Sequence, residues 1–169
     1  MTVVPITGVR NQMNKVFQKL SQDEELLRLL HYPEELDPLS TTLPDIIGSE
    51  NEWDIIEKHI FFAEKDSDLT DEPLCRIYIT TGRRRPVFGN TFVSTQDLFI
   101  NVIVHEKFVG NMHLERISDR INQLLLYNHI SGFGKITYKG GDTYQAPRQF
   151  QTYLHIYSYF VKQAFVEHW

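Results

Sequence analysis

Two stretches of sequence decide the fold, CRIYIT at residues 75–80 and DLFINVIVH at residues 97–105. Apolar side chains occupy every second position in both, which is the period of a half-buried β-strand. The connecting residues 82–94 contain glycine, proline and asparagine, the residue types that favour turns. The pattern therefore predicts two strands that pair as a β-hairpin with a long tip.

Downstream of this hairpin, the sequence predicts one helix and two more strands. The helix is marked by apolar residues three and four positions apart, which form a single stripe on a helix surface. The stripe consists of Leu114, Ile117, Ile121, Leu124 and Leu125. Residues 135–139 and 151–161 predict the two strands, which are joined through Gly140 and Gly141.

The last of these strands has two faces of different character. One face carries Leu154, Ile156 and Phe160, and the other carries Tyr153, His155, Tyr157 and Tyr159. We expect the first face to lie in the core. Because tyrosine combines an apolar ring with a polar hydroxyl, the second face suits a helix packed over the sheet or a contact between subunits. The three tyrosines are therefore candidate interface residues.

The first 72 residues predict a helical region. Apolar side chains between Val9 and Leu20 recur at helical spacing and indicate an amphipathic helix. Ser21 followed by Glu24 forms a capping-box pattern, which predicts a second short helix that ends near His31.

Residues 32–48 contain three prolines and predict an irregular connection. Ser49 and Glu52 repeat the capping-box spacing and indicate a third short helix. Residues 60–62, Ile-Phe-Phe, fit either a strand or more helix, because periodicity does not separate the two in so short a run.

The length of 169 residues fits one domain, with a helical region at 1–72 and a sheet-and-helix core at 73–169. The predicted class is α+β, with a largely antiparallel sheet of about four strands and helices on one face. With 41% hydrophobic residues, the chain has the composition of an ordinary globular protein.

The net charge of −5 is distributed unevenly along the chain. Residues 1–75 carry 16 acidic and 6 basic side chains, whereas residues 76–169 carry 6 acidic and 11 basic ones. A protein that coats nucleic acid has a clearly basic domain, and a pI near 5.8 disfavours that role. Opposite charges suit head-to-tail contact between copies, and a solvated acidic helix layer beside a mildly basic sheet is the alternative.

The sequence predicts no catalytic site, no metal site and no cofactor. Its seven histidines include no pair with metal-ligand spacing, and Cys75 has no partner for a disulfide. Phosphate-binding loops, dinucleotide-binding loops and serine-nucleophile motifs are missing from the sequence. No apolar run approaches the length of a membrane span, so we expect neither enzymatic activity nor a membrane partner.

A metal-dependent nuclease is the alternative function, with Asp97 and Glu106 as its metal ligands. Lys107 directly follows Glu106, however, and alternation along a strand sends these two side chains to opposite faces. The spacing therefore disfavours a nuclease site.

The hairpin tip carries Arg83, Arg84 and Arg85, followed by Phe88. The arginines suit DNA phosphates, carboxylates of a neighbouring copy, or water. We take these four residues as candidates for a subunit or partner interface.

The hairpin RIYITTGRRRPVFGNTFVSTQDLFINVIVHEK at 76–107 is followed by the helix HLERISDRINQLLLYN at 113–128 and the last two strands. In pattern and element order, these segments resemble the neck and tail-completion proteins of long-tailed bacteriophages, in particular the tail terminators. The resemblance implies a structural virion protein, made in the host cytoplasm and located at the head-tail interface.

That resemblance further implies a ring, commonly a hexamer, between the head connector and the tail tube. Such a ring stops tube polymerisation and lets DNA pass without specific binding. The long region 1–72 departs from the simplest tail terminators, so the alternatives are a terminator and another neck protein that contacts the portal side.

Overall fold

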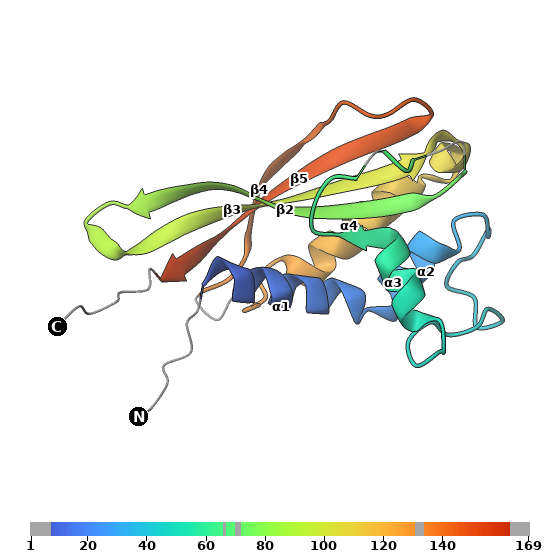
Figure 1. Ribbon diagram of the computed structural model, residues 1–169, viewed down its shortest axis with the longest axis horizontal. Coiled ribbons are helices and arrows are strands. Elements are labelled where there is room, and N and C mark those ends of the chain that lie inside the picture. Colours follow the sequence, from blue (N-terminus) through green and yellow to red (C-terminus); the bar gives the residue numbers. More distant parts are fainter. Residues whose placement is uncertain (1–7, 66, 70–71, 131–133, 163–169) are drawn as a thin grey trace.

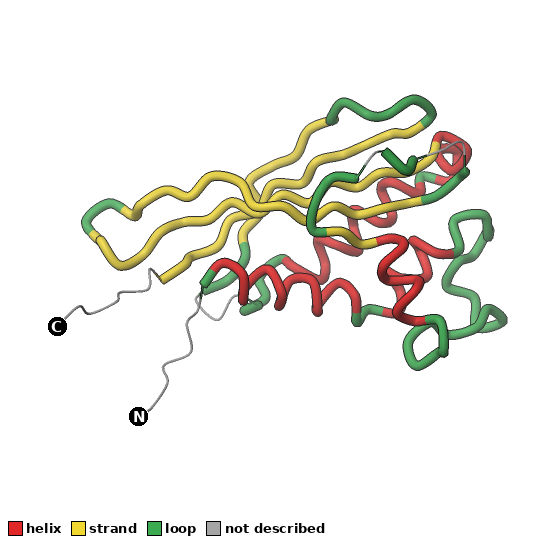
Figure 2. Tube along the Cα trace, in the orientation of Figure 1, coloured by secondary structure: helices red, strands yellow, loops and turns green. Residues whose placement is uncertain are grey.

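The computed structural model describes residues 8–65, 67–69, 72–130 and 134–162. It has the predicted α+β architecture, a twisted sheet with helices packed on one face (Figure 1). The helical N-terminal region packs against the same face as the helix that follows the hairpin, so the two regions share one hydrophobic core (Figure 2).

The sheet has five strands in the order β1-β2-β3-β5-β4, one more than expected. Their bounds are Ile60–Phe61 (β1), Cys75–Val87 (β2), Asn90–His105 (β3), Thr137–Thr143 (β4) and Phe150–Lys162 (β5). The extra strand is β1, which resolves the ambiguity at residues 60–62 and forms the only parallel pair among these five strands.

The hairpin of β2 and β3 is longer and more regular than predicted. We expected a long tip over residues 82–94, but strand pairing continues to Val87 and resumes at Asn90. Gly89 occupies the turn with a φ of +75°, a left-handed conformation that glycine adopts without strain. The pairing register shifts after Thr81 and after Pro86, so bulge-like irregularities lie within the paired part of the hairpin.

The α-helices are Val9–Ser21 (α1), Glu24–His31 (α2), Glu52–His59 (α3) and His113–Leu125 (α4), and a 3-10 helix (η1) spans Glu106–Asn111. Both capping-box predictions were wrong in detail. Ser21 is the last residue of α1, and Asp23 caps α2 by accepting a 2.8 Å hydrogen bond from the Leu26 amide. Asn51 is the residue before α3, whereas the Ser49 hydroxyl donates to the Ile46 carbonyl.

The prediction for the faces of β5 was also wrong. Register pairs Leu98 with Tyr157, which places the tyrosine under the helices with the apolar side of β3. The Tyr157 hydroxyl donates a 2.6 Å hydrogen bond to Asn122 Oδ1 on α4, so it is buried with its polar end satisfied. On the opposite face, Ile156 is half-buried and Phe160 is 41% exposed.

The N-terminal region is joined to the sheet-and-helix part by ion pairs as well as by packing. Asp23, which caps α2, also accepts two hydrogen bonds from the Arg120 guanidinium of α4, at 2.9 and 2.7 Å. Arg28 on α2 is almost fully buried and donates to Glu24, to Asp45 and to the Ser40 carbonyl. Arg28 therefore fixes the irregular connection that follows α2.

Candidate functional site

The hairpin of β2 and β3 extends beyond the helical layer at one end of the molecule (Figure 1). Its tip presents Phe88, whose side chain is fully exposed. Single exposed aromatic rings are common on protein surfaces, but this one stands at the turn of a projecting hairpin, where a partner can reach it. The tip therefore stays a candidate contact surface.

The three arginines of the hairpin have different surroundings. Arg83 is exposed at the irregularity of β2, and Arg84 Nε donates a 3.0 Å hydrogen bond to Gln96 Oε1 across the hairpin. Arg85 forms an ion pair with Asp97, with 3.0 Å between Nη2 and Oδ2. The charge of Arg85 is thus neutralised within the chain, and Arg83 and Arg84 supply the positive charge that a partner would meet.

The tyrosines of β5 do not form one accessible surface. Tyr157 and Tyr159 are buried beneath the helices, and burial raises the pKa of Tyr159 to about 12. The prediction that these two are interface residues was therefore wrong, and packing under helices was the correct alternative. Tyr153 remains half-buried, with its ring 4.8 Å from that of His155.

Tyr153 and His155 line a small pocket between α4 and the edge of the sheet, about 290 Å³ in volume. Burial lowers the pKa of His155 to about 4, so its imidazole is neutral at physiological pH. The Tyr138 hydroxyl lies 3.4 Å from His155 Nδ1. The pocket is also lined by the hydroxyl of Ser118 and by the carboxylates of Glu115 and Asp119, all from α4.

The proposed nuclease pair is not brought together. Asp97 is buried and already paired with Arg85, whereas Glu106 is exposed at the start of η1. Nine positions of extended chain separate them by roughly 30 Å. One metal ion cannot bind both carboxylates, so the nuclease alternative is overturned. Among the described ranges, no three histidine, cysteine or acidic side chains are grouped to hold a metal ion.

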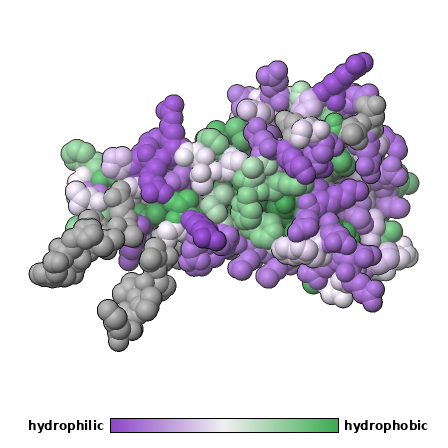
Figure 3. All heavy atoms as spheres, viewed as in Figure 1, coloured by the Kyte–Doolittle hydropathy of each residue, from purple (hydrophilic) through white to green (hydrophobic). Residues whose placement is uncertain are grey.

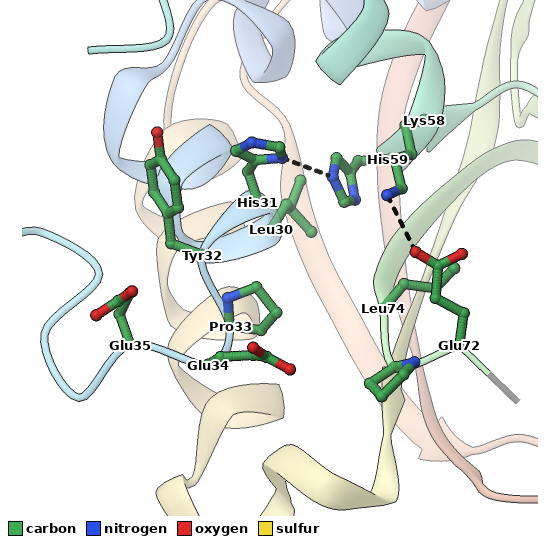
Figure 4. A pocket seen from close by; sticks show the side chains of 11 residues that line it. Leu30, His31, Tyr32, Pro33, Glu34, Glu35, Lys58, His59, Glu72 and Leu74 are labelled. Atoms are coloured by element: carbon green, nitrogen blue, oxygen red, sulfur yellow. Dashed lines mark hydrogen bonds and ion pairs between the residues drawn. The ribbon is translucent and has the colours of Figure 1, made fainter. Parts of the chain in front are cut away.

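Two histidines that the sequence did not single out as a pair meet at the ends of α2 and α3 (Figure 4). His59 Nδ1 donates a 2.7 Å hydrogen bond to the Cys75 carbonyl, and His59 Nε2 lies 3.4 Å from His31 Nδ1. Burial lowers the pKa of both, that of His59 to about 4. The pair is therefore neutral and joins two helix ends to β2.

Beside this histidine pair is an open pocket of about 330 Å³. Lys58 and Glu72 face each other at 3.5 Å on its wall (Figure 4). Glu34, also on the wall, accepts a 2.7 Å contact from Lys107 of η1. Three of the four charged residues that line the pocket, Glu34, Lys58 and Glu72, are thus in ion pairs within the chain, which suits a structural role for this region.

An aromatic groove, which the sequence analysis missed, lies between α1 and α3 and has a volume of about 420 Å³. Its apolar lining residues are Phe17, Trp53, Ile56 and Phe62. Trp53 is 58% and Phe62 is 47% exposed, although the Phe17 and Phe62 rings pack 5.0 Å apart. A hydrophobic patch is visible over the middle of the molecule in Figure 3. In the sequence, the signal for this groove was two large aromatics, Trp53 in the short α3 and Phe62 just after it.

In the part of the chain that the structure describes, no helix combines the length and the apolar character that crossing a bilayer demands.

Comparison with known proteins identifies the family of the chain. The model of the YomW family matches residues 23–159. A relative from Bacillus subtilis (strain 168), described as an SPbeta prophage-derived uncharacterized protein YomW, is 36% identical over 134 residues. The alignment covers 73% of this chain and 79% of the relative. The family match extends from the residue that caps α2 to the buried Tyr159 of β5, and the chain therefore belongs to the YomW family.

Proposed function

We propose that this protein is a structural component of a phage particle at the junction between head and tail. In this role, copies of the chain form a ring that ends the tail tube and joins it to the head connector, while DNA passes through. The role requires contacts between proteins and no bond-making step. The protein would be made in the host cytoplasm and retained in the virion.

One observation carries the proposal: a long hairpin with the exposed Phe88 at its tip projects beyond the body of the subunit. A projecting element of this kind suits contact with a neighbouring protein. The kinship with a prophage-derived protein supports a phage origin, and the α+β fold agrees with the expectation from neck proteins.

The charge distribution supports the same role. The acidic excess of residues 1–75 opposes tight binding to DNA phosphates, which suits a passage through which DNA slides. Arg83 and Arg84 are confined to the hairpin, where they favour contact with acidic protein surface. A hexamer is the ring size that the resemblance to tail terminators implies.

Deletion of the gene from an inducible phage that carries it tests the proposal. We expect the lysate to contain filled heads and separate tails, visible by electron microscopy, and few joined particles. Addition of the purified protein to that lysate should restore joined, infectious particles. Normal particles from the deletion phage would overturn the proposed role.

The same lysates separate the two alternatives within this role. Overlong tails in the deletion lysate identify a terminator, because tube growth then lacks its stop. Tails of normal length that remain unjoined identify a neck protein on the connector side.

A further inference from the structure

We infer that the aromatic groove between α1 and α3 binds the hairpin tip of a second copy of this chain, with Phe88 inserted against Trp53. This inference rests on the proposed ring and names the two surfaces that build it. It assigns a function to the groove, which the established family membership does not explain.

The groove has the composition of a binding site for an aromatic side chain. The buried Ile56 and the rings of Phe17, Phe62 and Trp53 line it, together with five polar residues. Trp53 Nε1 donates a 2.7 Å hydrogen bond to Glu57 Oε1, which holds the indole in place before any partner arrives. Preorganised aromatic anchors of this kind dominate the energetics of protein interfaces.

The hairpin tip supplies the complementary group. Phe88 is fully exposed at the turn, and figures of the surface show hydrophobic side chains at this end with hydrophilic ones directly behind them (Figure 3). Arg83 and Arg84, on β2, precede Phe88 by five and four positions, and both are exposed. The tip thus presents an aromatic ring with cations close behind it in the chain.

The charge on the α3 side of the groove has the opposite sign, whereas α1 on the other side carries Lys15 and Lys19. Four acidic residues lie on α3 or directly before it, namely Glu50, Glu52, Asp54 and Glu57. Glu52 lines the groove itself. Lys58, the basic residue near the end of α3, is paired with Glu72 and leaves the acidic excess in place. Complementary charge of this kind speeds association and selects the correct orientation.

The hairpin tip and the aromatic groove are far apart on one subunit, so a contact between them is head-to-tail. The hairpin tip and α3 lie toward opposite ends of the long axis of the molecule (Figure 1). A tip therefore reaches the groove of another copy and leaves its own groove open for a third. Repetition of such a head-to-tail contact forms a closed ring when the rotations between successive neighbours add up to one full turn.

Cross-linking of the full chain tests the contact directly. Thr91→Cys on the hairpin is combined with Gln22→Cys at the rim of the groove, both exposed positions, and the native Cys75 is buried. With a short bismaleimide, we expect a ladder of covalent oligomers. The matched control pairs Thr91→Cys with Lys139→Cys on β4, which is exposed but outside the groove, and should give no ladder.

Point variants test the role of the ring itself. Phe88→Ala should weaken self-association by about 30-fold, the effect of losing an interface anchor. Phe92→Ala, which changes another exposed aromatic of the same hairpin, should have little effect. In a Trp169→Phe background, the fluorescence of Trp53 should shift to shorter wavelength on assembly of the parent protein but not of Phe88→Ala.

The outcomes distinguish the inference from the proposed function. Suppose that Phe88→Ala oligomerises like the parent and that the Thr91→Cys, Gln22→Cys protein gives no specific ladder. These results overturn the groove contact and leave the ring proposal standing. A Phe88→Ala ring that assembles but fails to bind isolated tails shows that the tip docks on a tail protein, which also overturns it. Failure of the parent protein to oligomerise, alone or on heads and tails, overturns both.

Discussion

Arg85 and Asp97 form a two-point ion pair across the hairpin, with Nη1–Oδ1 at 3.2 Å and Nη2–Oδ2 at 3.0 Å. Asp97 is buried and Arg85 is about half exposed, so the arginine covers an otherwise unpaired carboxylate. The pair separates the functions of the three consecutive arginines. Arg85 stabilises the strand pairing, whereas Arg83 and Arg84 are available to a partner.

We predict that Arg85→Ala lowers the free energy of unfolding by about 1–2 kcal/mol, because it leaves a buried carboxylate without its partner. Arg83→Ala, two positions away and exposed, should leave the unfolding free energy almost unchanged. Urea unfolding of both variants measures the difference. Equal stability of the two variants would show that the ion pair has no role in folding.

We predict that the double variant Arg83→Glu, Arg84→Glu prevents self-assembly but leaves the monomer folded, because it places like charge opposite the acidic α3. The variant keeps Arg85, so Asp97 remains paired. Sedimentation velocity at low and high salt measures assembly, and salt should weaken the parent ring. The control is Arg148→Glu, which changes an exposed cation outside the hairpin and should assemble like the parent. A double variant that also assembles like the parent would show that Arg83 and Arg84 are not part of the interface.

We predict that Arg28→Ala costs about 1–3 kcal/mol of unfolding free energy, because Arg28 is buried and donates hydrogen bonds to acceptors of four residues. Hydrogen exchange should also become faster at Ile46 and Ile47, whose amides donate to Glu24, the partner of Arg28. The exposed Arg10→Ala is the control and should change little. Unchanged exchange at these amides would contradict the proposed role of Arg28.

Stability should fall as the pH is lowered from 6.5 toward 4, because His59 and His155 are buried and neutral. Burial lowers the pKa of each to about 4 from 6.5. In this window the unfolded chain binds protons that the folded chain does not, so unfolding is favoured as pH falls. Above pH 6.5 both histidines are neutral in the folded and in the unfolded chain, so they contribute no pH dependence to the stability.

The limiting slope is about 1.4 kcal/mol per pH unit for each histidine, measured by urea unfolding between pH 7 and pH 4. His59→Gln should reduce the slope by the share of one histidine. His129→Gln, at an exposed position, should leave it unchanged. A parent protein whose stability is flat over this window would contradict the burial of His59 and His155 in the neutral form.

The sequence predicts most of the fold because alternation and helical spacing are local. The strands that contain Ile77 and Ile100 and the helix around Ile117 follow from such patterns. Alternation does not say which face of β5 points to the helices, and pairing of Tyr157 with Leu98 decides it. Capping was mispredicted because Asp23 competes with Ser21 for the same helix start.

The candidate site was predicted only in part. Phe88 and the arginines belong to one contiguous stretch of the hairpin, so the sequence places them together. The aromatic groove combines Phe17 from α1 with Trp53 from α3, and the histidine pair joins residues 28 positions apart. Such groupings depend on how helices pack, which a single sequence does not specify.

The most direct test of the central claim is electron microscopy of isolated tails from the deletion phage after incubation with the purified protein. The proposal predicts a ring of fixed subunit number on the head-proximal end of the tube, with the hairpin of each subunit seated on its neighbour. Bare tube ends, with the protein still monomeric beside them, would contradict it.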